Sequence, residues 1–171
     1  VSAQLDGVDK SEANSNNSPF RSLKIDETYN MNAAYLHELY FANVGDGNSR
    51  ISMDSLSYMR LNRDFGTFDD WQRDFIACGM SSRCGWAVTY LNIYTQSYMN
   101  CVIDLHSQNV PVGMYPVIVM DLWQHAYYRD YLGDVRTYVV AMMKELNWEV
   151  IEARLAKVDS MINPQQAELG Q

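Results

Sequence analysis

Two side chains four residues apart, Asp121 and His125, are suited to holding a metal ion. Asp121 follows the apolar run 116–120, which predicts a strand, and His125 lies at the start of the next predicted helix. In that setting the carboxylate and the imidazole can face one point. His37, near the middle of an earlier predicted helix, could add a second imidazole. Two imidazoles and one carboxylate suit iron or manganese better than structural zinc, which favours thiolates.

Spacing alone leaves a structural explanation open. An aspartate that caps a helix, followed by a histidine satisfied within the core, gives the same Asp-x-x-x-His pattern. The third histidine of the sequence, His106, follows a predicted strand in a turn. That position suits an extra metal ligand, a hydrogen-bond donor beside the ligands, or an ordinary exposed side chain. On spacing, the metal centre is therefore one of two explanations.

Helices on both sides of a small sheet must position these residues. The apolar and aromatic spacing predicts helices over 25–44, 51–62 and 68–80. β-branched and aromatic residues then predict strands over 86–94, 98–105 and 116–120. The helical pattern returns over 123–158, with interruptions near Gly133 and Asn147. This order predicts an α+β fold: N-terminal helices, a three-stranded antiparallel sheet, and C-terminal helices flanking it.

Polar segments lie at both ends of the chain. Residues 1–22 are nearly free of aromatic side chains and predict an arm that cannot bury enough surface to fold alone. Residues 160–171 predict a similar tail. We therefore expect one domain over 23–159. No secretory signal or basic presequence is recognisable, but the chain begins at Val1, so a processed or excised start stays open.

Composition argues against several classes of function. A formal net charge of −8 and a pI of about 4.7 argue against nucleic acid as a partner, because phosphate binding needs clustered Lys and Arg. No apolar run approaches the roughly 18 residues of a membrane-spanning helix. The odd cysteine count, without zinc-site spacing, indicates reduced thiols in a reducing compartment such as the mitochondrial matrix or cytoplasm. The cysteines are Cys78, Cys84 and Cys101.

The residues around His125 resemble the iron/manganese superoxide dismutase family. The run Asp121-Leu-Trp-Gln-His-Ala-Tyr-Tyr128 is similar to the family's Asp-x-Trp-Glu-His-Ala-Tyr-Tyr signature, and Tyr138 and Asn147-Trp148 follow at the family's offsets. Three earlier segments are similar to the family's second helix, its Phe-Gly-Ser-Phe turn and its Gly-Ser-Gly-Trp. They are residues 32–41, 64–68 and 84–86. Five segments in the same order cover about residues 32–155, too many to be explained by chance.

The resemblance implies a chemistry and a ligand set. It implies one iron or manganese ion per chain and superoxide as the substrate, converted to dioxygen and hydrogen peroxide. It implies that the ligands are His37, Asp121 and His125. Trp86 and Trp123 would form the aromatic shell around them, with plain core packing as the alternative for each.

The same resemblance suggests further site residues. Gln108 falls near the glutamine with which manganese-type members tune the potential of the metal, although a surface turn explains it equally well. Tyr35 and Tyr29 are candidates for the tyrosine at the substrate gateway, with core packing as the alternative. Gln124 and Tyr128 flank the ligand His125 in the signature and are expected close to it.

The sequence departs from the family pattern at several places. The family's first helix supplies another ligand histidine and the gateway tyrosine, but no histidine precedes His37. The fourth ligand would then be missing, replaced by solvent, or donated by another molecule, with His106 as the spare candidate. Gln124 replaces a glutamate that in the family clamps a ligand histidine of the partner subunit. The family's arginine near the substrate funnel falls on Val135 in a gapless alignment, with Arg136 one place later. Ala33 replaces the iron-type glutamine, which favours manganese or mixed use.

Three functions fit these observations. The first is a superoxide dismutase. The second is a dismutase-like subunit, impaired or inactive, in a large assembly such as an organellar ribosome, a respiratory complex or a virion. The third is other oxygen chemistry at an open coordination position. An apolar face left without the family's first helix predicts a partner, either a second copy in a homodimer or a larger assembly.

Overall fold

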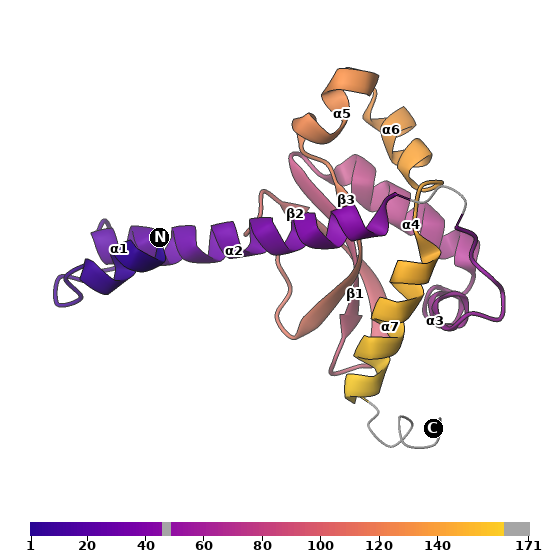
Figure 1. The fold of residues 1–171 in the computed structure, drawn as a ribbon, viewed down its shortest axis with the longest axis horizontal. Helices are drawn as coiled ribbons and strands as arrows, with labels where there is room; N and C mark the ends of the chain where they lie inside the picture. The colour runs from indigo at the N-terminus through magenta and orange to yellow at the C-terminus, as the bar shows by residue number, and fades with distance from the viewer. Residues whose placement is uncertain (46–48, 163–171) are drawn as a thin grey trace.

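The computed structural model describes residues 1–45 and 49–162, which form seven helices around one sheet (Figure 1). Before the sheet come α1 (Ser2–Gly7), α2 (Pro19–Asn43), α3 (Leu56–Phe65) and α4 (Phe68–Ser81). The strands are β1 (Gly85–Asn92), β2 (Ser97–Asp104) and β3 (Met114–Asp121). After the sheet come α5 (Gln124–Tyr131), α6 (Val135–Met142) and α7 (Trp148–Ile162). The predicted α+β order of helices, three strands and helices is confirmed.

The sheet is antiparallel with the order β2-β1-β3, so β1 is paired on both sides. Because helices pack on both faces of the sheet, the side chains of β1 are buried almost continuously. The strand begins at Gly85, where a Cβ atom would lie 1.9 Å from the carbonyl oxygen of Ile103, so the close approach of β2 requires glycine. β3 is an edge strand, which tolerates Pro116 within it. The register pairs Trp86 with Asp121 at the end of β3.

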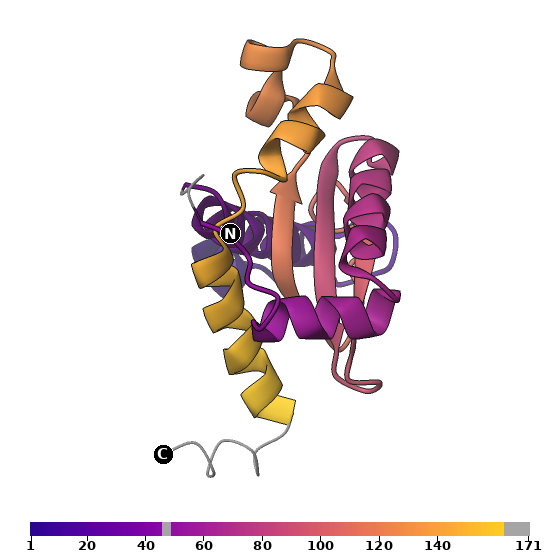
Figure 2. The same ribbon diagram turned by 90° about the vertical axis from the view of Figure 1, so that its right-hand side faces the viewer.

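Helices cover both faces of the sheet (Figures 1 and 2). On one face, Leu36 and Tyr40 of α2 pack with Trp86, Val88 and Val119 of the strands. On the other face lies the larger core of the molecule, built from α3, α4, α6 and α7 with the opposite sides of the strands. The N-terminal half of α2 projects beyond the sheet together with α1 (Figure 1). The candidate ligands of α2 and β3 therefore meet on the face that α2 covers.

The N-terminal segment carries more helix than its composition predicts. α2 begins at Pro19, not near residue 25, because Ser18 accepts a hydrogen bond from the Arg21 N–H at 3.2 Å and proline is favourable in the first helical turn. α1 packs on α2 and buries Leu5. Of the predicted tail, residues 160–162 belong to α7, and 163–171 lie outside the described residues. The boundaries 1–22, 23–159 and 160–171 stay a prediction.

No helix among the described residues is long and apolar enough to cross a lipid bilayer.

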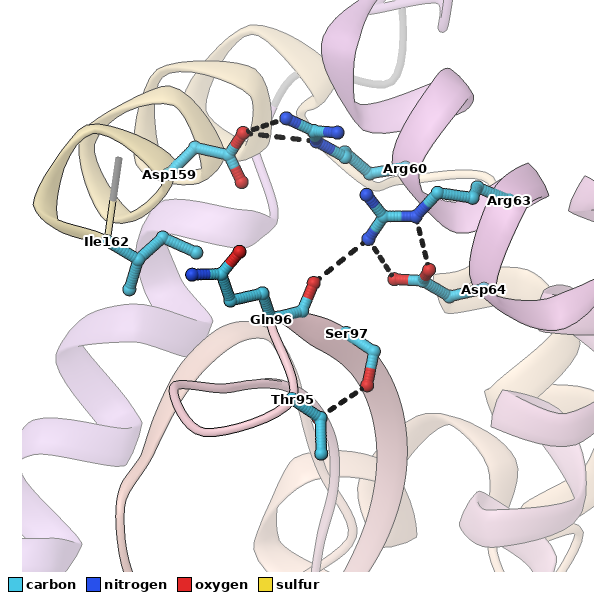
Figure 3. A pocket seen from close by; sticks show the side chains of 8 residues that line it. All are labelled: Arg60, Arg63, Asp64, Thr95, Gln96, Ser97, Asp159 and Ile162. Atoms are coloured by element: carbon cyan, nitrogen blue, oxygen red, sulfur yellow. Dashed lines mark hydrogen bonds and ion pairs between the residues drawn. The ribbon is translucent and has the colours of Figure 1, made fainter. Parts of the chain in front are cut away.

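A polar pocket of about 350 Å³ lies at the turn between β1 and β2 (Figure 3), at the opposite end of β1 from Trp86 and Asp121. Two arginines of α3 line it, and each is paired with an aspartate. Arg60 Nε donates to Asp159 Oδ2 of α7 at 3.0 Å, and Arg63 Nη2 donates to Asp64 Oδ2 at 2.8 Å. Arg63 Nη2 also donates to the carbonyl oxygen of Gln96 at 3.0 Å. The pocket is therefore formed by α3, α7 and the hairpin turn, and the charges of its two arginines and two aspartates cancel.

Glu152 of α7 holds the start of α3, and its replacement by glutamine is expected to destabilise the fold. The carboxylate accepts hydrogen bonds from the backbone N–H groups of Leu56 and Ser57 at 2.6 and 2.8 Å, and from the Ser57 hydroxyl. These N–H groups begin the helix and have no partner within it. We expect Glu152→Gln to lower the free energy of unfolding by about 1–3 kcal/mol, because hydrogen bonds to a charged acceptor are lost. Urea denaturation measures this, and a loss no larger than in Glu38→Gln, an exposed control, would contradict it.

Candidate metal centre

Three predicted ligands from distant parts of the chain lie together at the end of the sheet. His37 comes from α2, Asp121 is the last residue of β3, and His125 lies in the first turn of α5. Their candidate ligand atoms all lie within 4.8 Å of one another, and no further residue joins this group within the described ranges 1–45 and 49–162. Asp121 Oδ2 lies 3.0 Å from His125 Nε2 and 3.5 Å from His37 Nε2. The carboxylate oxygen thus faces both imidazoles.

A backbone contact sets the orientation of the His37 ring. Its Nδ1 lies 2.7 Å from the carbonyl oxygen of Ala33, one turn earlier in α2. Because a carbonyl oxygen only accepts, Nδ1 carries the hydrogen and donates it. The Nε2 lone pair is then free on the side of the ring that faces Asp121. This is the tautomer that a metal ligand needs, fixed by a hydrogen bond from its other nitrogen.

Asp121 is almost fully buried, which is costly for a carboxylate without compensation. Burial raises the pKa of its carboxyl group, while hydrogen bonds from the Trp123 N–H and from His125, followed by charge interaction with the histidines, oppose that rise. The Trp123 N–H donates to Oδ1 at 2.9 Å, which leaves Oδ2 for the two imidazoles. A cation between these three groups would balance the buried charge.

Aromatic rings enclose the histidines. Trp86 is completely buried and meets the His37 ring edge-on, with centroids 4.7 Å apart. Trp123 stacks on His106 at 4.6 Å and on His125 at 6.1 Å. Both tryptophans therefore lie against the candidate ligands, as the resemblance implies, and restrict the space around them. The His125 side chain is nevertheless 58% exposed and that of His37 28% exposed, so the group is open on one side.

His106 lies beside the three residues but outside their group. Its Nδ1 accepts a hydrogen bond from the indole N–H of Trp86 at 3.0 Å. An indole nitrogen only donates, so the neutral His106 ring carries its hydrogen on Nε2. Burial lowers the pKa of His106, and the nearby His37 and His125 lower it further, which keeps the ring neutral. The ring centroid lies 5.8 Å from that of His37.

The other predicted site residues are distributed differently. Gln108 is exposed in the turn that follows β2, whereas His106 in the same turn is buried. Tyr35 is 49% exposed and lines an apolar groove with Tyr90 and Pro116. Tyr29 instead meets the His106 ring edge-on at 4.8 Å.

Helical periodicity shows which of the two tyrosines, Tyr29 or Tyr35, lies on the same face of α2 as His37. Residues four apart share one face of a helix, so Tyr29, Ala33 and His37 line up along α2, whereas Tyr35, two positions before His37, points elsewhere. Gln124 and Tyr128 are exposed on α5, beside His125. They are accessible to another molecule.

The donor set fits a single small cation. Metal bonds of about 2.0–2.2 Å to nitrogen and oxygen place two ligand atoms of one ion roughly 3 to 4 Å apart. The two distances to Asp121 Oδ2, 3.0 and 3.5 Å, lie in this range. The free Nε2 of His37 and the buried carboxylate supply the donor chemistry that manganese and iron accept. The residues present therefore suit such an ion without a change of fold.

Comparison with known proteins gives a consistent result. A family model described as "Iron/manganese superoxide dismutases, C-terminal domain" matches residues 55–154, which include Asp121 and His125. "Superoxide dismutase [Fe]" of Aquifex pyrophilus is 35% identical over 150 residues, covering 88% of this chain and 70% of that protein. The protein of the same name from Aquifex aeolicus is 34% identical over the same shares. "Superoxide dismutase [Mn] 2" of Halobacterium salinarum is 28% identical over 80% of this chain and 67% of that protein.

These matches extend beyond the C-terminal segment. With 88% of the chain matched to the Aquifex proteins, the unmatched remainder is too short to exclude His37, so the similarity spans the elements that carry all three residues of the group. The fold is also the expected one, with helices on both faces of a three-stranded antiparallel sheet. On this evidence the chain is a member of the iron/manganese superoxide dismutase family.

Proposed function

We propose that this chain is a superoxide dismutase that works with one manganese or iron ion held by His37, Asp121 and His125. One observation carries the proposal: a buried carboxylate lies between two imidazoles from distant elements, with all ligand atoms within 4.8 Å of one another. The names of the similar proteins, which specify iron in some and manganese in others, support the same choice of metals. The ligand set accepts both ions, so the proposal covers both.

The chemistry divides between the ion and the chain. When bound, the ion would alternate between its trivalent and divalent states, oxidising one superoxide to dioxygen and reducing the next, with two protons from solvent, to hydrogen peroxide. The chain's own residues hold the donor atoms and supply a hydrogen-bond donor. Trp86 and Trp123 pack against the histidines and fix the positions of their rings. His106, kept neutral with its hydrogen on Nε2, is in our proposal the donor beside the site.

His106 thereby takes the role that the resemblance suggests for Gln108. The supporting observations are its burial, its stacking on Trp123 and its distance of 5.8 Å from the His37 ring. Tyr29, in contact with His106, is the tyrosine we propose at the approach to the site. Tyr35 lies on another face of α2, which argues against that role for it.

Within the described residues, no fourth ligand joins His37, Asp121 and His125 at a further coordination position. The sequence has three histidines, and the Nδ1 of the third, His106, accepts the hydrogen bond of the Trp86 indole N–H. We propose that solvent or a group from another molecule fills this position. The exposed faces of His125, Gln124 and Tyr128 are where a second copy or another protein would approach.

The rival function is a dismutase-like structural subunit without turnover. It is favoured by Gln124, an amide at a position where the family resemblance implies a charged clamp, and by Val135 in place of an arginine. An amide brings no charge to hold the orientation of a partner's imidazole. Metal binding and catalysis therefore need separate measurements.

Metal analysis combined with a superoxide-consumption assay tests the proposal. Protein expressed in manganese-supplemented or iron-supplemented medium is expected to retain close to one ion per chain and to consume superoxide faster than the metal-free protein. Less than about 0.1 ion per chain under both conditions would contradict the proposal, because a site of this kind binds only with its ligands in place. Full occupancy without turnover would favour the impaired subunit.

A further inference from the structure

Two buried tyrosines form a hydrogen-bonded chain behind the metal centre. The hydroxyl groups of Tyr40 and Tyr138 lie 3.1 Å apart, and the Tyr138 hydroxyl lies 2.7 Å from the backbone carbonyl oxygen of Asp121. The two residues are only 8% and 1% exposed. Polar groups this deep in a core are retained only when their hydrogen bonds are satisfied, which these contacts achieve.

The chemistry of the groups fixes the direction of the chain. The Asp121 carbonyl oxygen only accepts, so the Tyr138 hydroxyl donates to it. The Tyr138 oxygen is then the acceptor for the hydroxyl of Tyr40. Burial raises the pKa of both phenols, so both keep their hydrogens at neutral pH. The order is Tyr40 to Tyr138 to Asp121.

This chain links the two elements whose separation sets the metal centre. Tyr40 follows His37 by three residues, so it lies one turn further along α2 on a nearby face. Tyr138 belongs to α6, which lies beyond the end of β3 with α5 (Figure 1). α2 and β3 are distant in sequence, and the distance from His37 Nε2 to Asp121 Oδ2 depends on how they are docked. Metal-binding residues need to be held to within about 0.5 Å, and buried hydrogen bonds behind them supply such precision.

We propose that Tyr40 and Tyr138 form a hydroxyl brace that sets the spacing between His37 and Asp121, which makes both tyrosines positioning residues for the ion. The inference rests on the proposed function, because it assumes that the three residues bind a metal. It differs from simple core packing in one respect. A packing role depends on the aromatic rings, whereas the brace depends on the hydroxyl groups, and phenylalanine keeps the ring while removing the hydroxyl.

The test compares Mn²⁺ affinity in Tyr40→Phe, Tyr138→Phe and the double variant, measured by calorimetry on metal-free protein. We expect Tyr138→Phe to weaken binding by about 10-fold, the scale found for groups that orient metal ligands. Tyr40→Phe is expected to weaken binding to a similar extent and to change the same readouts, because loss of its hydroxyl also breaks the link between α2 and Asp121. The double variant is expected to match Tyr138→Phe, because without the Tyr138 hydroxyl the Tyr40 hydroxyl has lost its link to Asp121.

Tyr131→Phe is the matched control. Its ring is partly buried and meets Tyr138 edge-on at 5.6 Å, but its hydroxyl takes no part in the brace. The visible absorption spectrum of the Co²⁺-loaded proteins adds a readout of ligand geometry that general destabilisation does not move. We expect the Co²⁺ spectrum to change in Tyr138→Phe and in the double variant. In Tyr131→Phe we expect the wild-type spectrum.

The outcomes separate the two proposals. Wild-type affinity and an unchanged Co²⁺ spectrum in Tyr138→Phe, even with a lower melting temperature, would show that the tyrosines only pack. If Tyr138→Phe does not fold, Tyr40→Phe decides alone, and no change in either readout would overturn the brace. A wild-type protein that binds none of Mn²⁺, Fe²⁺ and Co²⁺ would overturn the proposed function itself, and the brace with it.

Discussion

Replacement of His125 by alanine is expected to abolish metal binding, whereas replacement of His106 by alanine is expected to leave the metal bound. His125 provides an Nε2 atom 3.0 Å from the Asp121 carboxylate, while the Nδ1 of His106 is occupied by the Trp86 indole. Loss of a direct ligand should weaken binding by more than the roughly 10–100-fold that is typical when a supporting group is removed. His106→Ala should weaken metal binding by no more than that range, so that the metal stays bound, and should lower the rate of turnover.

Titration of metal-free protein with Mn²⁺ provides the comparison. The histidines are matched controls for each other, because they are stacked on the same tryptophan, Trp123. Circular dichroism before titration establishes that both variants are folded. An equal loss of affinity in the two variants would show that the ligand set is wrong.

Replacement of Trp71 by alanine is expected to give the largest loss of stability. Trp71 is completely buried in α4, packs against Phe75 and Trp148, and donates its indole N–H to Thr89 Oγ1 of the central strand at 3.0 Å. Truncation leaves a cavity and an altered hydrogen-bond network. We expect a loss of about 3–5 kcal/mol in the free energy of unfolding, which is a large part of the stability of an ordinary domain.

Urea denaturation of Trp71→Ala, Trp71→Phe and Tyr94→Ala measures this loss. It also separates the contribution of ring packing from that of the hydrogen bond to Thr89. Trp71→Phe retains an aromatic ring but removes the donor to Thr89, so its effect should be smaller than that of alanine. Tyr94 is 78% exposed, and its replacement is expected to cost less than about 1 kcal/mol, as for most surface substitutions. Similar losses in Trp71→Ala and Tyr94→Ala would contradict the packing described for the larger core.

Strong local signals made much of the fold predictable. α4 lies at Phe68–Ser81, close to the predicted 68–80, because Thr67 caps it and accepts from the Asp70 N–H at 3.0 Å. The strands were also predictable, because β-branched and aromatic residues are frequent in them, as in the GWAVTYLN of β1. α3 begins at Leu56 and not at residue 51, because Ser55 is its cap, a signal that the apolar pattern alone does not reveal.

The candidate site was predictable in part. The pairing of Asp121 with His125 follows from their spacing. The contribution of His37 depends on how α2 docks on the sheet, so the sequence pattern offered it only as a possibility and the family resemblance supported it. The choice between His106 and Gln108 depends on the turn after β2. There Leu105 adopts a positive φ of 56°, and His106 is buried whereas Gln108, two positions later, is exposed. Such a turn, with no glycine to mark it, leaves no clear trace in a sequence.

Anomalous diffraction at the manganese absorption edge, from crystals of the manganese-loaded protein, tests the convergence of the three ligands most directly. We predict one strong anomalous peak about 2.0–2.2 Å from Nε2 of His37, Nε2 of His125 and a carboxylate oxygen of Asp121. A peak elsewhere on the molecule, or fully loaded protein with no density between these side chains, would contradict the account.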